Sequence, residues 1–137
     1  MSPAAGDRRP RIAVVADDLI WATRLVDGVR RAGAEPVAIR SSAALEAGLA
    51  GVAGVVVDTT ARAYDPIAVL RRATSLGIPA IAVAPHVDVE GRRAARAAGA
   101  TRVHPYQVLF ERGDRELAAW LAALGWPRDG VAEEERA

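Results

Sequence analysis

Residues 52–60, with the sequence VAGVVVDTT, decide the fold, and their apolar run ends abruptly at Asp58. The run is too short to span a membrane. Apolar residues at successive positions predict a strand that is covered on both faces, as in the centre of a parallel sheet. A carboxylate at the end of such a strand lies at the carboxyl edge of the sheet, where open α/β sheets bind their ligands. We therefore expect Asp58 to mark a candidate site.

Outward from this strand, further strand patterns alternate with helical spacing of apolar residues. The other predicted strands are residues 11–16 (RIAVVA), 35–40 (EPVAIR), 79–84 (PAIAVA) and 101–104. Helices are predicted after Asp18, from Ser41 or Ser42 to about Leu49, after Asp65-Pro66, after Asp88, and over residues 114–124. Right-handed crossovers would wind these elements into an α/β, flavodoxin-like three-layer sandwich with five parallel strands in the order 2-1-3-4-5.

Length and composition narrow the class of protein. The chain has 137 residues and a formal net charge of +1, which fits one domain and gives no basic field for nucleic acid. Cysteine is absent, which excludes a disulfide, a thiol nucleophile and a zinc–thiolate site. We expect a disordered arm over residues 1–10, the domain over residues 11–124 and a tail over residues 125–137. The first residues lack the apolar stretch of a secretion signal, so a cytoplasmic location is expected, with no membrane partner.

From about residue 11 to residue 124 the chain resembles a response-regulator receiver domain of the CheY-like superfamily. The resemblance rests on the acidic residues in VVADD, on VVVD at the end of the third strand, on the spacing in DTTARAYDP and on AAGA before the fifth strand. It implies that Asp58 stands where the family carries its phosphoacceptor aspartate. It also implies a neighbouring acidic pair that would hold Mg²⁺ together with Asp58.

The chain departs from the family in this site. Counting back from Gly33, Ala16 stands where the first acid of the pair is expected and Asp17 where the second is expected. Ala84 takes the place of the family's hydroxyl residue. All 18 basic residues are arginine, so His104 or Tyr106 replaces the lysine that pairs with the phosphate. Because phosphoryl transfer needs a cation and Mg²⁺, the sequence predicts an atypical receiver, or pseudo-receiver, with no catalytic residue and no cofactor.

Alternatives stay open for each acidic residue. Asp17 and Asp58 are weak Mg²⁺ candidates, and Asp18 could substitute for the missing acid unless it caps the following helix. A protonated His104, or Arg62 from the loop, could replace the lysine. Asp58 could instead be a strand-end carboxylate that accepts backbone N–H bonds.

The degenerate acidic pocket of Asp17, Asp18 and Asp58 has a predicted rim. Its members are Trp21, Thr59, Thr60, Ala84, His86, His104 and Tyr106. Trp21 lies off the main apolar face of the first helix, so it either closes the emptied phosphate pocket by packing or offers a binding surface. His86 is expected to make a hydrogen bond that fixes a loop rather than to take part in chemistry.

Two functions from different classes follow, with a weaker third. The preferred one is a stand-alone regulatory domain, not an enzyme, that binds a protein partner or itself without phosphorylation. Its interface would be the face made by the fourth helix, the fifth strand and the last helix. The alternative is a single-domain response regulator that is phosphorylated on Asp58 and uses Mg²⁺. The third is a flavodoxin-like binder of a small ligand, which only the fold supports.

Overall fold

The computed structural model describes residues 9–126 and contains one parallel sheet in the order β2-β1-β3-β4-β5, as predicted. The strands are β1 (Arg11–Val15), β2 (Glu35–Ile39), β3 (Gly54–Asp58), β4 (Ala80–Ala84) and β5 (Ala100–Pro105). β3 pairs with β1 on one side and with β4 on the other, so the stretch that ends at Asp58 is central. All of its residues are buried, because helices cover both faces of the sheet.

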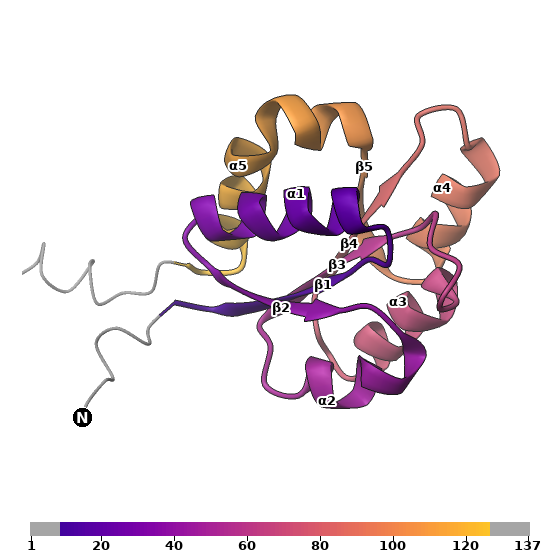
Figure 1. Ribbon diagram of the computed structural model, residues 1–137, viewed down its shortest axis with the longest axis horizontal. Helices are drawn as coiled ribbons and strands as arrows, with labels where there is room; N and C mark the ends of the chain where they lie inside the picture. Colours follow the sequence, from indigo (N-terminus) through magenta and orange to yellow (C-terminus); the bar gives the residue numbers. More distant parts are fainter. Residues whose placement is uncertain (1–8, 127–137) are drawn as a thin grey trace, which may run out of the picture.

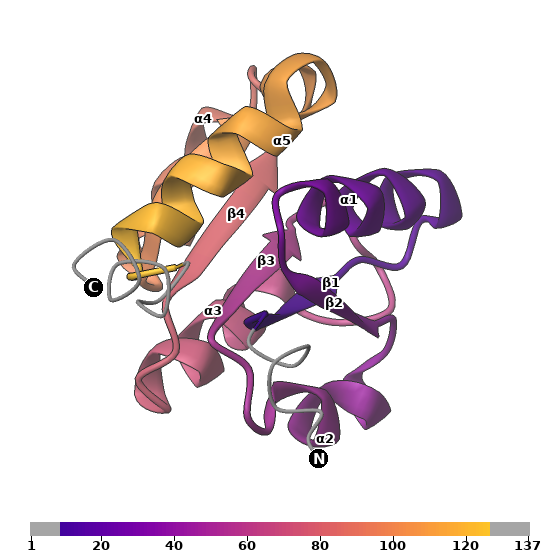
Figure 2. The same cartoon turned by 90° about the vertical axis from the view of Figure 1, so that its left-hand side faces the viewer.

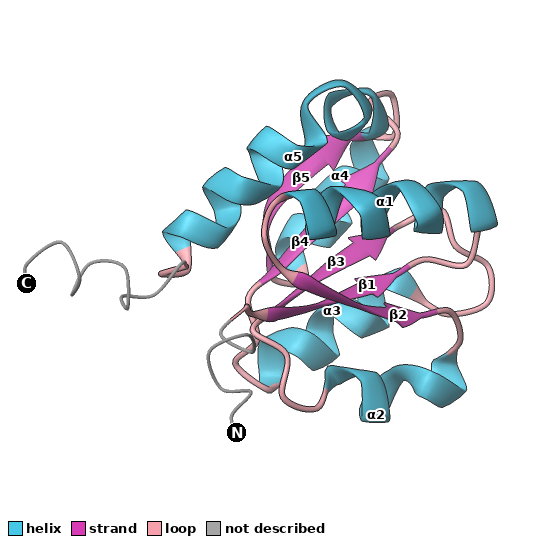
Figure 3. Ribbon diagram, turned by 60° about the vertical axis from the view of Figure 1, so that its left-hand side comes forward, coloured by secondary structure: helices cyan, strands magenta, loops and turns pink. Residues whose placement is uncertain are grey.

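Helices form the two outer layers (Figures 1 and 3). One layer consists of α1 (Leu19–Arg31) and α5 (Tyr106–Ala123), which lie on the same face in the turned view of Figure 2 as well. The other layer consists of η2 (Ser42–Ala44), α2 (Leu45–Leu49), α3 (Pro66–Ser75) and α4 (Val89–Ala97). The fold class predicted from the sequence is therefore confirmed.

Strand alternation divides the core between these layers. Towards α1 and α5 the sheet presents Ile12, Val14, Val56, Ile81 and Val83. Towards α3 and α4 it presents Ala13, Val15, Val55, Val57 and Ala82. Since side chains two positions apart share a face, Asp58 lies on the side of Val56, beneath α1 and α5.

Aspartates begin three of the helices, as the sequence predicts. Asp18 accepts a hydrogen bond from Trp21 N–H, Asp65 from two backbone N–H groups of α3, and Asp88 from Gly91 N–H. The predicted serine cap of the second helix is confirmed in position but not in hydrogen bonding, because Ser41 is the N-cap residue of η2. The first turn of this helix is a 3-10 turn, Ser41 makes no capping bond, and the Ser42 hydroxyl donates instead to the Ala63 carbonyl.

The last helix begins earlier than the predicted residues 114–124. α5 starts at Tyr106, directly after β5, and its backbone is non-helical at Arg112 (φ −136°, ψ 29°). Leu109 is buried against the same cluster as Leu117, so the extra turn has an apolar side of its own. The break at Arg112 and the glycine that follows it interrupt the periodicity, which hides this turn in the sequence. The extra turn is what brings Tyr106 and Phe110 next to α1.

The described backbone extends slightly beyond the predicted domain boundaries. Pro10 is buried, and its carbonyl accepts a hydrogen bond of 2.8 Å from Glu35 N–H. After α5, Trp126 N–H donates to the Leu121 carbonyl, and the Trp126 side chain packs on the cluster beneath α1 and α5. The rest of the predicted arm and tail, residues 1–8 and 127–137, lies outside the described residues. None of the helices within residues 9–126 has the length and apolar character needed to cross a membrane.

Candidate functional site

Asp58 lies at the carboxyl edge of the sheet and has no exposed surface. Its Oδ1 accepts hydrogen bonds from Thr60 N–H at 3.0 Å, from the Thr60 hydroxyl at 2.8 Å and from the Tyr106 phenol. Its Oδ2 is buried and has no hydrogen-bond partner among the described residues. One carboxylate oxygen is therefore well supported by donors, and the other is enclosed and has no donor among the described residues.

Tyr106 covers Asp58 from the first turn of α5. Its hydroxyl lies 3.0 Å from the Thr60 hydroxyl as well. Burial and the hydrogen bond to Asp58 raise the pKa of Tyr106 above the ordinary value of 10.0, so the phenol keeps its proton and acts as a donor. The sequence left His104 and Tyr106 as alternatives at the family's lysine position. In the structure Tyr106 is the one that reaches Asp58.

Trp21 lies on α1 and packs over Tyr106. The two ring centroids are 4.3 Å apart with an angle of 52° between the planes, a tilted arrangement that is favourable for aromatic pairs. Phe110 adds an edge contact to Trp21, with centroids 6.3 Å apart. Trp21 therefore packs on the ring that covers Asp58, as the packing alternative for this residue expects.

Asp17 and Asp18 do not join Asp58 in one acidic site. Asp17 Oδ2 accepts backbone N–H bonds from Arg62 at 2.8 Å and from Ala63 at 2.7 Å, so this carboxylate anchors the loop after β3. The bond from Ala63 is the largest influence on Asp17 and lowers its pKa below the ordinary value of 3.8. Asp18 caps α1 through Trp21 N–H at 3.0 Å. Arg62 contributes its backbone N–H to this anchor, and its side chain is exposed.

Tyr64 is a buried residue of the site that the sequence analysis missed. Its hydroxyl lies 2.6 Å from the Val15 carbonyl and 3.0 Å from the Asp58 carbonyl, so it bridges the ends of β1 and β3. Burial raises its pKa, and the phenol stays a donor. The only signal in the sequence is an aromatic residue in a polar loop, which does not reveal a partner.

The remaining predicted rim residues lie elsewhere. Thr59 N–H and the Thr59 hydroxyl both contact the Val83 carbonyl at 3.0 Å, which extends the pairing of β3 with β4. Ala84 is fully buried in the cluster beneath α3 and α4, so it does not line an opening. His86 is exposed, and its carbonyl, rather than its ring, accepts a bond of 3.3 Å from Arg92. His104 is half-buried, and burial lowers its pKa, which disfavours the protonated form that could replace lysine.

The residues at this edge do not fit a resident Mg²⁺. Ala16, at the place of the family's first acid, is buried and apolar. Asp17 and Asp18 are held by backbone N–H groups, and Asp58 Oδ1 is held by Thr60 and Tyr106. Within residues 9–126 no group of three or more His, Cys, Asp or Glu side chains is placed to hold a metal ion. A hard dication requires about six oxygen ligands, and the one unengaged oxygen of Asp58 is enclosed.

Comparison with solved structures shows the same fold in response-regulator receiver domains. The phosphorylated cyanobacterial phytochrome response regulator RcpA matches with a TM-score of 0.70 and 11% identity, covering 88% of this chain and 97% of that chain. A response-regulator receiver domain protein from Clostridium thermocellum matches with a TM-score of 0.67 and 15% identity, covering 84% of this chain and 98% of that chain. A CheY-like receiver domain protein from Methanospirillum hungatei matches with a TM-score of 0.61 and 20% identity, covering 80% of this chain and 94% of that chain.

At such identities these matches show the fold alone: the chain has the five-stranded receiver fold. No protein-family model matches the sequence, and no curated protein matches it.

Proposed function

We propose that this chain is an atypical receiver domain of the cytoplasm, a pseudo-receiver that regulates a protein partner without being phosphorylated and without acting as an enzyme. The observation that carries the proposal is the closed state of Asp58, which has no exposed surface beneath Tyr106. An in-line phosphoryl transfer requires a donor to approach the carboxylate. Here the approach is filled by a phenol that is itself held by Trp21.

The missing charges support the same conclusion. No lysine is present in the chain, and the residue that takes its place at Asp58 is a neutral phenol. A phosphoryl group bonded to Asp58 Oδ2 would replace the single charge of the carboxylate with the larger charge of the phosphoryl oxygens, at a buried position where no described donor lies. Without a cation or a metal ion, that charge is strongly unfavourable in a water-excluded site.

The face made by α4, β5 and α5 is the proposed partner surface. β5 is an edge strand that pairs with β4 alone, and its Thr101 and Arg102 are exposed. At the start of α4, Val87 and Val89 are exposed apolar side chains. A hollow of about 220 Å³ next to them is lined by His86, Val89, Arg92, Arg93 and Arg96. Apolar side chains ringed by arginines suit a partner with acidic residues around an apolar contact.

Amide spectra of the ¹⁵N-labelled chain test the closed site. We expect Mg²⁺ followed by beryllofluoride, a phosphoryl analogue, to leave the resonances near Asp58, Ala84 and His104 unchanged at millimolar metal. Asp58→Asn is the control for any shift that arises elsewhere. Saturable shifts that vanish in Asp58→Asn would overturn the proposal in favour of a response regulator phosphorylated on Asp58.

Cross-linking to a native partner tests the surface separately. A partner captured by the wild-type chain should bind Asp58→Asn equally well and should lose binding to the double variant Arg92→Glu and Arg96→Glu. Dependence of that binding on Asp58 would contradict a function without phosphorylation.

A further inference from the structure

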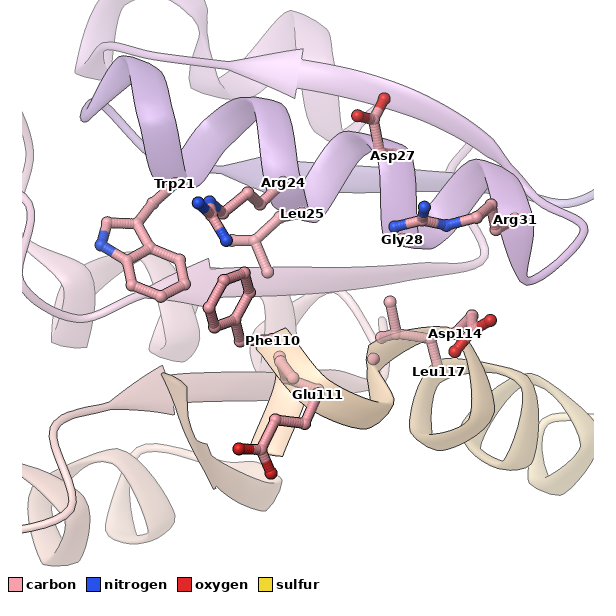
Figure 4. Close-up of a pocket in the computed structure, with 12 residues that line it drawn as sticks. Trp21, Arg24, Leu25, Asp27, Gly28, Arg31, Phe110, Glu111, Asp114 and Leu117 are labelled. Carbon is pink, nitrogen blue, oxygen red and sulfur yellow. The ribbon is translucent and has the colours of Figure 1, made fainter. Parts of the chain in front are cut away.

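A groove of about 310 Å³ lies between α1 and α5 (Figure 4), and Asp58 does not line it. Trp21, Leu25 and Gly28 line it from α1, and Leu109, Phe110 and Leu117 line it from α5. The helices approach one another closely at Gly28, where an added Cβ would lie 3.2 Å from Leu117 Cδ1. The absence of side chains at Gly28 and Gly113 contributes to the hollow.

Phe110 stands at the opening of this groove and is 59% exposed. The guanidinium carbon of Arg24 lies 3.9 Å from the Phe110 ring centroid and 5.8 Å from the Trp21 ring, so the arginine is stacked on aromatic surface. Stacking holds the guanidinium while its in-plane N–H groups stay available for a carboxylate. Exposed aromatic and arginine side chains of this kind commonly anchor protein interfaces.

The two walls of the groove carry opposite charge. The α1 wall has Arg24 and Arg31, and the α5 wall has Glu111 and Asp114 (Figure 4). The remaining charged lining residue, Asp27, is paired with Arg30 at 3.7 Å. Within residues 9–126, no ion pair joins the two walls across the groove. Among the described residues, Glu111 and Asp114 accept only local bonds, from Gln107 and from Arg115 N–H.

We propose that the α1–α5 groove is an interface between two copies of this chain related by a two-fold axis. Such an axis places the basic wall of each copy against the acidic wall of the other, so the surface is complementary to itself. It also places Phe110 of each copy at the groove of the other. The interface involves α1, which the proposed partner surface does not, and it does not depend on that proposal.

Two charge-reversed variants test the proposal by sedimentation equilibrium. The first, Arg24→Glu with Arg31→Glu, makes both walls acidic; the second, Glu111→Arg with Asp114→Arg, makes both walls basic. We expect the wild-type chain to be a dimer and each variant alone to be a monomer. An equimolar mixture of the two variants should form a heterodimer, because each wall then meets one of opposite charge. Phe110→Ser should also be monomeric.

A matched control reverses two exposed arginines away from the groove, Arg11→Glu with Arg71→Glu, and should stay dimeric. Circular dichroism verifies that each variant is folded. If a charge-reversed variant is unfolded, Phe110→Ser tests the dimer interface in its place. A wild-type chain that is monomeric at submillimolar concentration would overturn the proposal. So would a mixture of the two variants that stays monomeric, or variants that dimerise as the wild-type chain does.

Discussion

Asp58 ends β3 and Asp17 follows the neighbouring strand β1, so both lie at the same edge of the sheet, but their hydrogen-bond partners differ. Asp58 is enclosed, and side-chain hydroxyls of Thr60 and Tyr106 donate to it. Asp17 is only partly buried, and backbone N–H groups of the loop after β3 donate to it. In a phosphorylated receiver the two carboxylates would share a metal ion. Here each carboxylate accepts hydrogen bonds from a separate set of donors, so Asp58 and Asp17 do not form one acidic site.

We expect β3 to tolerate a buried carboxylate at its end, at Asp58, but not in its interior, at Val56. Val56 and Asp58 lie on the same face of β3, and neither has exposed surface. Only the end of the strand is reached by a loop and by the first turn of α5, which supply donors. Burial of a charge is tolerated where hydrogen bonds replace water.

Val56→Asp should have the largest effect, because it places a carboxylate among apolar side chains without any donor. We expect a loss of at least about 3 kcal/mol in the free energy of unfolding, enough to unfold a domain of ordinary stability. Urea unfolding followed by circular dichroism measures it. Val56→Ala, which removes methyl groups and adds no charge, is the control and should fold. A folded, stable Val56→Asp would show that donors are not what distinguishes position 58.

Asp58→Ala should cost about 1–3 kcal/mol, because it leaves the Tyr106 phenol and the Thr60 donors without their shared acceptor. Asp58→Asn keeps an acceptor oxygen and removes the buried charge, so its stability should stay within about 1 kcal/mol of the wild type. The same urea experiment compares both. If Asp58→Asn were as damaging as Val56→Asp, the charge of Asp58 would be required for the fold. The interpretation of Asp58 as part of a phosphoacceptor-like pocket would then be wrong.

Tyr106→Phe should cost about 1.5 kcal/mol, since it removes one charge-assisted bond to Asp58 and keeps the ring that packs on Trp21. The loss should shrink when the substitution is made in Asp58→Asn, because the two side chains interact directly. A double-mutant cycle on urea unfolding free energies measures this coupling. Equal losses in both backgrounds would mean that the phenol does not support the carboxylate.

Asp17→Asn should have the smallest effect, about 1 kcal/mol or less, because the group is close to solvent. The pKa of Asp17 is lower in the folded chain than its ordinary value of 3.8. Its stabilising contribution is therefore present above pH 3.8 and is lost as the pH falls through the folded pKa. Thermal unfolding of both chains against pH should show their difference narrowing at acid pH. A difference that does not change with pH would argue against an ionised loop anchor.

The fold could be predicted from the sequence because each strand carries its own periodic signal. The apolar run before Asp58 and the capping aspartates are local patterns, and they indicate the central strand and most helix starts. The strand order then follows from right-handed crossovers. The first turn of α5 could not be found this way, since the break at Arg112 interrupts its spacing. The placement of Tyr106 over Asp58 depends on that turn and on Trp21 from α1. The Tyr64 hydroxyl likewise contacts backbone carbonyls of two different strands. The spacing of residues in the sequence does not predict such contacts.

The closed state of Asp58 is the central claim, and intact-mass spectrometry tests it most directly. The wild-type chain and Asp58→Asn are incubated with acetyl phosphate and Mg²⁺, and their masses are compared over time. We predict that neither chain gains the mass of a phosphoryl group, because the carboxylate is buried beneath Tyr106, has no lysine beside it and lies among described residues that do not fit a metal ion. A phosphoryl adduct on the wild-type chain that is absent from Asp58→Asn would contradict the claim and show that the pocket opens.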